Sequence, residues 1–299
     1  MVREITKPSK FEELRSVGSA SELLIFVHGL GGHYRKTWGQ LPDFMEDDQR
    51  FDETDFYLLG YDSGLLKFFV PGIHTLAQRL ITILLHEYTS QDTVRIISHS
   101  MGGLIVKEAI SQALLDGKAQ ELSRLRHVIF CSTPHLGETK ANILQFIGRH
   151  LKELKALKPT TMASHKIWIS RVTQTSSRLE DDISHERYAL AVRITNFWGL
   201  SDKMVTEVNA TALPTDENLI VPGDHSSIVK PRNTDDQVYL DLSSVLNSSV
   251  TSRNPRPSER IMARSRSLGD SNLVIRRTLE LPERYEQLCS AYQLSKRGG

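Results

Sequence analysis

The sequence has little cysteine, no long apolar run and almost no net charge. Its 299 residues include two cysteines, Cys131 and Cys289, too few for a disulfide framework or a cysteine-ligated zinc site. No apolar run approaches the roughly 20 residues that cross a bilayer, and the first ten residues have no apolar segment behind their charges. Secretion and membrane insertion are therefore disfavoured, and we expect a cytoplasmic protein.

The charge balance argues against another class of function. The 37 Lys and Arg residues and 36 Asp and Glu residues leave a net charge of +1 at pH 7, so no overall field would hold nucleic acid or an anionic membrane. Several of the 11 histidines lack metal-like spacing with acidic or cysteine neighbours, among them His33, His74 and His150. We predict no nucleic-acid partner, no metal site and no cofactor.

Short apolar runs alternate with helical patterns along the chain. Hydrophobic residues make up 39% of it, enough to bury a core. The runs predict strands at residues 23–27, 55–60, 93–98, 127–131, 191–197 and 218–221. Helical spacing predicts helices at 75–86, 103–115 and about 234–246. Because strands and helices alternate, we predict an α/β fold with a doubly wound, mostly parallel sheet.

Two regions depart from this repeat. Residues 135–188 form a long excursion between two strands, and we interpret about 136–188 as a helical cap insertion. From about residue 249 the chain is rich in Ser, Arg and Pro, and from residue 251 its ten basic and five acidic residues give a charge of +5. We predict a folded domain at 1–248 and a solvated linker at 249–299. One alternative for 249–299 is the start of a second module. Another is that this tail contacts an acidic partner, mediates oligomerisation or joins a fusion partner.

The segment from Ile96 to Gly103, IISHSMGG, lies where a predicted strand ends and a helix begins. It follows the nucleophile-elbow pattern G-x-S-x-G, in which small residues flank the serine because the turn is sharp. Ser98 replaces the first glycine and keeps a small side chain there. Ser100 is therefore the candidate nucleophile, with the backbone N–H of Met101 as one donor to an oxyanion.

A serine hydroxyl needs a positioned base, which should follow it in the chain with an acid between them. Only one histidine, His225, lies beyond residue 185, and it directly follows the last predicted strand. It is the candidate base. Asp202 follows the strand predicted at 191–197 and is the candidate acid. Glu207 and Asp224 are the alternatives, although an immediate neighbour rarely bends back to its own imidazole.

The glycine-rich segment HGLGG, residues 28–32, follows the first predicted strand and lets the main chain approach a reacting carbonyl closely. We predict that the Leu30 N–H supplies the second oxyanion donor, with Gly31 as the near alternative. His28 and His99 flank this functional backbone. We expect both to order loops or face solvent rather than to catalyse.

Apolar side chains also crowd a predicted loop, GLLKFFVPGI at residues 64–73. One interpretation is ordinary packing. The other is an acyl-chain groove or a flap in transient contact with a membrane, beside Ser100, since exposed apolar surface of that size usually binds something. The second interpretation makes Phe68 and Phe69 candidate substrate-binding residues.

Five motifs in this order resemble the α/β-hydrolase superfamily, over about residues 20–247: VHGLGGHYRKTW, ISHSMGGLIVKEAI, CSTPHLGE, GLSDKMV and GDHSSIVKP. In particular they resemble its serine esterase and lipase branch. Within that branch the sequence is similar to serine-active-site-containing phospholipid-remodelling proteins and to hydrolase modules fused ahead of NACHT-type sensors. The resemblance implies an α/β-hydrolase fold and a triad of Ser100, Asp202 and His225 acting on acyl esters.

We therefore expect a serine hydrolase that cleaves carboxylic esters, with lipid or phospholipid acyl chains as its substrates. An amidase, thioesterase or transacylase would use the same triad. From a different class, the alternative is an inert interaction module, or an effector module of a larger sensor that acts only when assembled.

Overall fold

The computed structural model describes residues 4–9, 12–29, 31–61, 72–136, 151–173 and 188–248. Its strands are β1 (Glu4–Ser9), β2 (Glu12–Ser16), β3 (Glu22–Val27), β4 (Thr54–Leu59), β5 (Thr93–His99), β6 (Leu125–Cys131), β7 (Val172–Thr173), β8 (Leu190–Ala191), β9 (Arg193–Gly199) and β10 (Glu217–Val221). Its α-helices are α1 (Leu41–Glu46), α2 (Ile73–Thr82), α3 (Met101–Leu115), α5 (Leu151–Arg171), α6 (Glu207–Ala210) and α7 (Gln237–Ser248).

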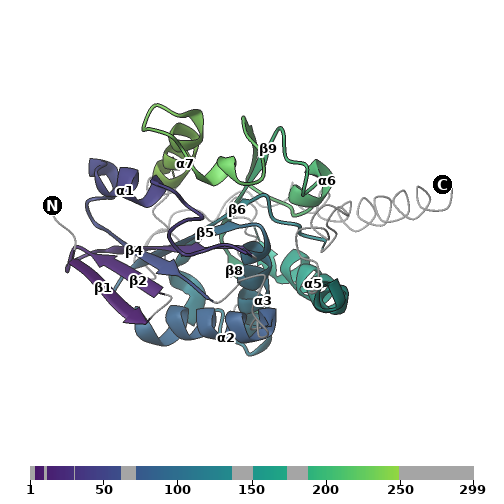
Figure 1. Cartoon of the computed structure of the whole chain (residues 1–299). Helices are drawn as coiled ribbons and strands as arrows, with labels where there is room; N and C mark the ends of the chain where they lie inside the picture. The colour runs from purple at the N-terminus through teal and green to yellow at the C-terminus, as the bar shows by residue number, and fades with distance from the viewer. Residues whose placement is uncertain are drawn as a thin grey trace, which may run out of the picture. The chain divides into compact units, whose positions relative to one another are not determined.

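Eight strands form one sheet in the order β1-β2-β4-β3-β5-β6-β9-β10, and β7 pairs with β8 separately. The six strands from β4 to β10 in this order pair in parallel. Figure 1 shows α1 and α7 on one side of the sheet and α2, α3 and α5 on the other. The six predicted strands and the doubly wound, mostly parallel sheet are therefore confirmed.

The antiparallel strands β1 and β2 were not predicted from the sequence. β1 forms the sheet edge and contains Pro8, which cannot donate a ladder hydrogen bond and is tolerated on edge strands. In β2 the carboxylate of Glu13 is fully buried and accepts hydrogen bonds from Arg15 (2.9 Å) and Arg35. Because charged side chains are buried here in pairs, the segment lacks the apolar pattern that marks a strand.

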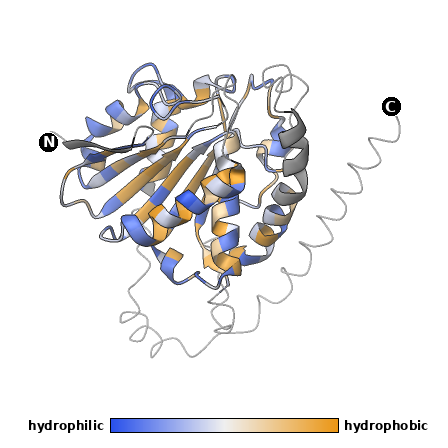
Figure 2. Ribbon diagram, turned by 60° about the horizontal axis from the view of Figure 1, so that its bottom comes forward, coloured by the Kyte–Doolittle hydropathy of each residue, from blue (hydrophilic) through white to orange (hydrophobic). Residues whose placement is uncertain are grey.

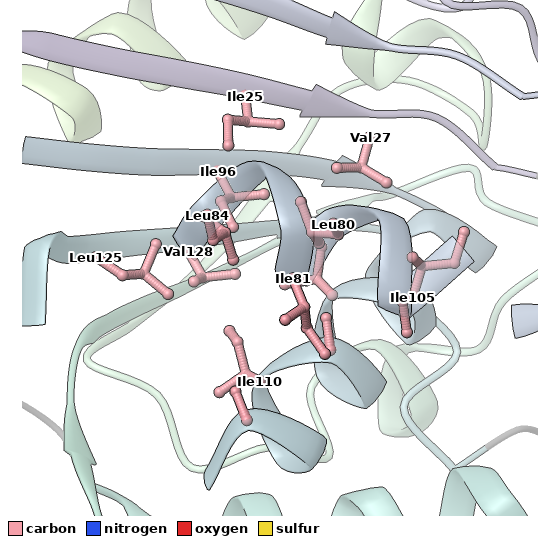
Figure 3. Close-up of a cluster of buried hydrophobic side chains, with 14 of the residues drawn as sticks. Ile25, Val27, Leu80, Ile81, Leu84, Ile96, Ile105, Ile110, Leu125 and Val128 are labelled. Carbon is pink, nitrogen blue, oxygen red and sulfur yellow. The ribbon is translucent and has the colours of Figure 1, made fainter. Parts of the chain in front are cut away.

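Alternate side chains of the central strands enter two separate cores. On one face Ile25, Ile96 and Val128 pack with residues of α2 and α3 (Figure 3). On the other face Phe26 and Ile97 belong to a core that includes residues of α1 and α7. Figure 2 shows the same arrangement as apolar strands with helices of mixed hydropathy beside them. Burial on both faces explains why these strands are continuous apolar runs.

The cap predicted at 136–188 is described at 136, 151–173 and 188. In α5, Trp168 is buried in the core shared with α3, with its ring 5.6 Å from that of Phe130 in β6. This part of the insertion therefore packs beside α3. Residues 137–150 and 174–187 lie outside the described residues, as do Leu30, Phe68, Phe69 and the linker predicted at 249–299, and the cap and the linker stay predictions. No helix within the described residues has the length and apolar character needed to span a membrane.

A buried lysine connects α3 to α5. The Nζ of Lys107 donates to the main-chain carbonyl of His135 (2.9 Å) and lies 3.0 Å from Nδ1 of His165. Burial lowers the pKa of Lys107 to about 7 and, together with the charge of Lys107, the pKa of His165 to about 3. Above about pH 7 this contact therefore joins two neutral groups.

We predict that Lys107→Met removes a pH dependence of stability. An unfolded lysine titrates near 10.5, whereas burial lowers the pKa of Lys107 to about 7, so between these values the unfolded chain binds more protons than the folded one. The free energy of unfolding should therefore rise with pH in this window, by up to about 1.4 kcal/mol per pH unit, in the wild type only. Urea unfolding at several pH values measures both slopes, and equal slopes would contradict a neutral Lys107.

Candidate active site

Ser100 lies in the turn that joins β5 to α3. Its backbone has a conformation that residues other than glycine rarely adopt. Its φ is 55° and its ψ is −126°, and its N–H donates to the carbonyl of Cys131 in β6 (2.9 Å). Ser98, which replaces the usual glycine, is fully buried and donates its hydroxyl to the carbonyl of Ile129 (3.1 Å). The substitution is therefore accommodated by a hydrogen bond, and the elbow geometry is kept.

Three glycines allow the chain to close tightly around Ser100. A Cβ atom at Gly102 would overlap the carbonyl oxygen of Val27, and one at Gly103 would overlap the side chain of Thr133. A Cβ atom at Gly29 would lie 2.8 Å from the Cβ of Ser100. The start of α3 therefore presses against the end of β3 and the loop after β6, and the glycine-rich loop runs directly beside Ser100.

The structure brings Ser100, His225 and Asp202 together from three loops at the carboxyl edge of the sheet. The Nε2 of His225 lies 3.0 Å from the Oγ of Ser100, and its Nδ1 lies 2.9 Å from Oδ2 of Asp202. A carboxylate only accepts, so Nδ1 carries the proton of a neutral His225 and Nε2 accepts from the serine hydroxyl. These are the contacts that the predicted nucleophile, base and acid require.

Asp202 is held by its own loop. Its side chain is fully buried, and Oδ1 accepts hydrogen bonds from the N–H groups of Met204 (2.7 Å) and Val205 (3.0 Å). Burial raises the pKa of this carboxyl, but the hydrogen bond and charge of His225 act in the opposite direction and leave it below its ordinary value. Asp202 is therefore a carboxylate at neutral pH.

Main-chain contacts join the loop that carries Asp202 to the loop that carries His225. The N–H of Ser201 donates to the carbonyl of Gly223 (2.9 Å), and a Cβ atom at Gly199 would lie 2.7 Å from the same oxygen. Gly223 has a φ of 137°, which favours glycine. Asp202 and His225 are therefore positioned by backbone contacts as well as by their side chains.

The two alternative acids lie elsewhere. Glu207 is the exposed first residue of α6. Asp224 is also exposed, and its Oδ1 accepts from the N–H groups of Ser226 and Ser227 at 2.9 Å, bonds that lower the pKa of its carboxyl. Asp224 thus stabilises the turn that follows His225, and Nδ1 of His225 donates its hydrogen bond to Asp202.

The two predicted oxyanion donors are only partly described. Met101 is the first residue of α3, where an N–H has no acceptor within the helix. The loop of the second donor has a hydrogen bond from the N–H of Gly32 to the carbonyl of Gly29 (3.1 Å), and Gly31 has a φ of 70°. Leu30 itself lies outside the described residues, so its role stays a prediction.

His28 and His99 are both buried, as expected for residues that order loops rather than for residues that face solvent. His28 contacts the carbonyl of Gly29 through Nδ1 (2.8 Å) and stacks on Tyr61 at 4.2 Å between ring centroids. Burial lowers the pKa of His28 to about 4. Sequence analysis did not identify Tyr61, whose hydroxyl donates to the carbonyl of His28 (2.6 Å).

Sequence analysis also missed Ser132, which follows β6. It has a φ of 45°, its N–H donates to the carbonyl of Phe197 (2.7 Å), and its buried hydroxyl has no hydrogen-bond partner among the described residues. The motif CSTPHLGE contains this residue, but no local pattern in it predicts this bond to Phe197 in β9. Within the described residues, no group of three or more His, Cys, Asp or Glu side chains is arranged to hold a metal ion.

Solved structures provide one line of comparison. The "Putative hydrolase" of Agrobacterium vitis S4 is 14% identical, with a TM-score of 0.52 over 83% of this chain and 97% of the other. The monoacylglycerol lipase of Paleococcus ferrophilus is 14% identical, with a TM-score of 0.49 over 82% of this chain and 99% of the other. No curated protein matches the chain. At 14% identity, the likeness to the Agrobacterium vitis structure supports the fold alone.

A family of sequences provides the second line. The family described as "Putative serine esterase (DUF676)" matches residues 18–175, which is more than half of the chain. The matched part contains the glycine-rich loop, the elbow with Ser100 and the strands that flank it. The protein therefore has the α/β-hydrolase fold and belongs to the DUF676 family of serine esterases.

Proposed function

We propose that Ser100, His225 and Asp202 form a catalytic triad that hydrolyses carboxylic esters through an acyl-enzyme, with lipid or phospholipid acyl chains as the substrates. The observation that carries the proposal is the pair of hydrogen bonds that joins the three side chains, 3.0 Å from Ser100 to His225 and 2.9 Å from His225 to Asp202. Family membership among serine esterases supports the reaction class.

In the first half of the reaction, Oγ of Ser100 attacks the ester carbonyl carbon while its proton passes to Nε2 of His225. The resulting imidazolium is stabilised by the carboxylate of Asp202. The negative carbonyl oxygen accepts hydrogen bonds from the N–H of Met101 and from a backbone N–H of the loop that contains Leu30. Collapse then expels the alcohol, which takes the proton from His225, and leaves the acyl group on Ser100.

In the second half, water attacks the acyl carbon. His225, neutral again, takes a proton from this water, and collapse of the second tetrahedral intermediate returns that proton to Ser100 and releases the carboxylic acid. Asp202 keeps Nδ1 protonated throughout, so that Nε2 remains available for proton transfer. Its two hydrogen bonds from the N–H groups of Met204 and Val205 hold it in the required orientation.

The lipid part of the proposal is supported by apolar side chains exposed in the chain around Asp202. Leu200 and Val208 are each 68% exposed, two residues before and six residues after that aspartate. Leu200 lies in the same loop as Asp202, so an apolar side chain is exposed beside the proposed site, which favours an apolar substrate over a polar one. Phe68 and Phe69 remain the proposed contacts for an acyl chain.

We expect Ser100→Ala to lower the turnover of p-nitrophenyl acetate by about 10⁵-fold or more, because the members of a triad act as a unit. A fluorophosphonate probe should label the wild type at Ser100 and leave the variant unlabelled. Wild-type turnover that persists in the variant, or labelling at another residue, would refute the assignment of Ser100 as nucleophile. Labelling that requires a partner protein would favour a module that acts only when assembled.

Gly29→Ala should slow the reaction without unfolding the protein. The new Cβ would lie 2.8 Å from the Cβ of Ser100, so one of the two must move, and a displacement of about 1 Å costs roughly 10²-fold in rate. Gly72→Ala is the matched control, because among the described residues no atom outside its chain neighbours lies within 4 Å of its new Cβ. The test compares kcat/KM and urea midpoints of both variants, and wild-type kcat/KM in Gly29→Ala would contradict the tight approach of this loop.

The substrate class is tested by lipid analysis of cells that express the wild type or Ser100→Ala. We expect one class of acyl lipids to fall in wild-type cells only, with a matching rise in the fatty acid and the deacylated product. A matching rise in a newly acylated lipid would favour a transacylase. If the two lipid profiles are identical while p-nitrophenyl acetate is still hydrolysed by the wild type, the lipid part of the proposal is wrong.

A further inference from the structure

His99, the last residue of β5, connects the nucleophile to the loop of the base. The Nε2 atom of its side chain lies 2.6 Å from the main-chain carbonyl oxygen of His225, which is 126 positions further along the sequence. A carbonyl oxygen only accepts hydrogen bonds, so Nε2 of His99 carries the proton. Among the described residues, this is the hydrogen bond that we find for the carbonyl of His225.

The other contacts of the His225 loop leave this carbonyl to His99. The carboxylate of Asp224 accepts from Ser226 and Ser227, which orders the turn after His225. Before His225, the carbonyl of Gly223 accepts from the N–H of Ser201 (2.9 Å), which holds this loop to the loop of Asp202. The bond from His99 is therefore the contact that ties the backbone of His225 to the strand that carries Ser100.

His99 is also suited to stay neutral while His225 changes its charge. It is buried, its ring centroid lies 4.9 Å from that of His225, and Trp38 packs against it with ring centroids 6.5 Å apart. Burial, and after it the neighbouring His225, lower the pKa of His99 to about 3. His99 thus does not compete with His225 for the serine proton, and it adds no positive charge beside the imidazolium.

We propose that His99 is a positioning residue, whose Nε2–H bond to the main-chain carbonyl of His225 holds the base at hydrogen-bonding distance from Ser100. This inference rests on the proposed function, since it assigns a role relative to the triad. Without the bond, the loop of His225 can shift while Ser100, held by β5 and α3, stays in place. The separation between Oγ and Nε2 would then vary, and proton transfer would slow.

The test compares two substitutions at this position. His99→Leu removes the donor, and His99→Gln keeps a side-chain N–H at a similar reach. We expect His99→Leu to lower kcat for p-nitrophenyl acetate by about 10- to 100-fold with KM nearly unchanged, and His99→Gln to recover most of that loss. The rate of fluorophosphonate labelling at saturating probe should follow kcat, because it also depends on His225.

His127→Leu is the matched control. His127 is a fully buried histidine on the neighbouring strand β6, and its Nε2 lies 2.8 Å from Oγ1 of Thr195, outside the triad. All rates are expressed per labelled Ser100, and urea midpoints report stability separately. We expect His127→Leu to change the midpoint and leave kcat per labelled site unchanged, so a loss confined to His99→Leu reports positioning.

The possible outcomes separate this inference from the proposed function. An inactive, unlabelled wild type overturns the triad itself. An active wild type with an equally active His99→Leu overturns the role of His99 alone. If His99→Leu does not fold, His99→Gln decides. A folded His99→Gln variant with nearly wild-type kcat supports the bond, and a folded His99→Gln variant whose kcat is about 10- to 100-fold lower overturns it.

Discussion

The turn at Ser100 is the constraint on which the rest of the site depends. A serine with a φ of 55° is held there at a cost of about 1–3 kcal/mol. The compensation is close packing: Gly102 and Gly103 let α3 press on the end of β3 and the loop after β6, and the N–H of Ser100 bonds to Cys131. Cores on both faces of the sheet keep these elements rigid. The hydroxyl is therefore presented beside the loop that begins at Gly29.

The histidines of the site are differentiated by their surroundings. His28 and His99 are buried against rings and backbone, and their pKa values are lowered to about 4 and about 3, so both are neutral. His225 instead faces the buried carboxylate of Asp202, whose pKa lies below its ordinary value. The imidazole of His225 thus has a negative partner that stabilises its protonated form. The imidazoles of His28 and His99 instead contact the main chain around it. The difference lies in the partner each ring meets, since the residue type is the same.

Much of the fold follows from local patterns, and the exceptions have identifiable causes. The parallel strands are apolar because they are covered on both faces, so runs such as 23–27 predict them well. β2 was not predicted because Glu13 and Arg15 are buried as an ion pair. Local hydropathy cannot distinguish such buried charged side chains from exposed ones. The described part of the predicted cap packs with Trp168 beside α3, since an amphipathic helix does not specify which surface it covers.

The sequence by itself determined the parallel core, the elbow around Ser100 and the order Ser100, Asp202, His225 of the proposed triad along the chain. Only the tertiary structure decided which carboxylate meets His225, namely Asp202 rather than Asp224 or Glu207, and that His99 contacts the loop of His225. The physical reason is the distance along the sequence over which each signal acts. Apolar periodicity and small residues act within a few positions, whereas these contacts join segments brought together by the register of a sheet.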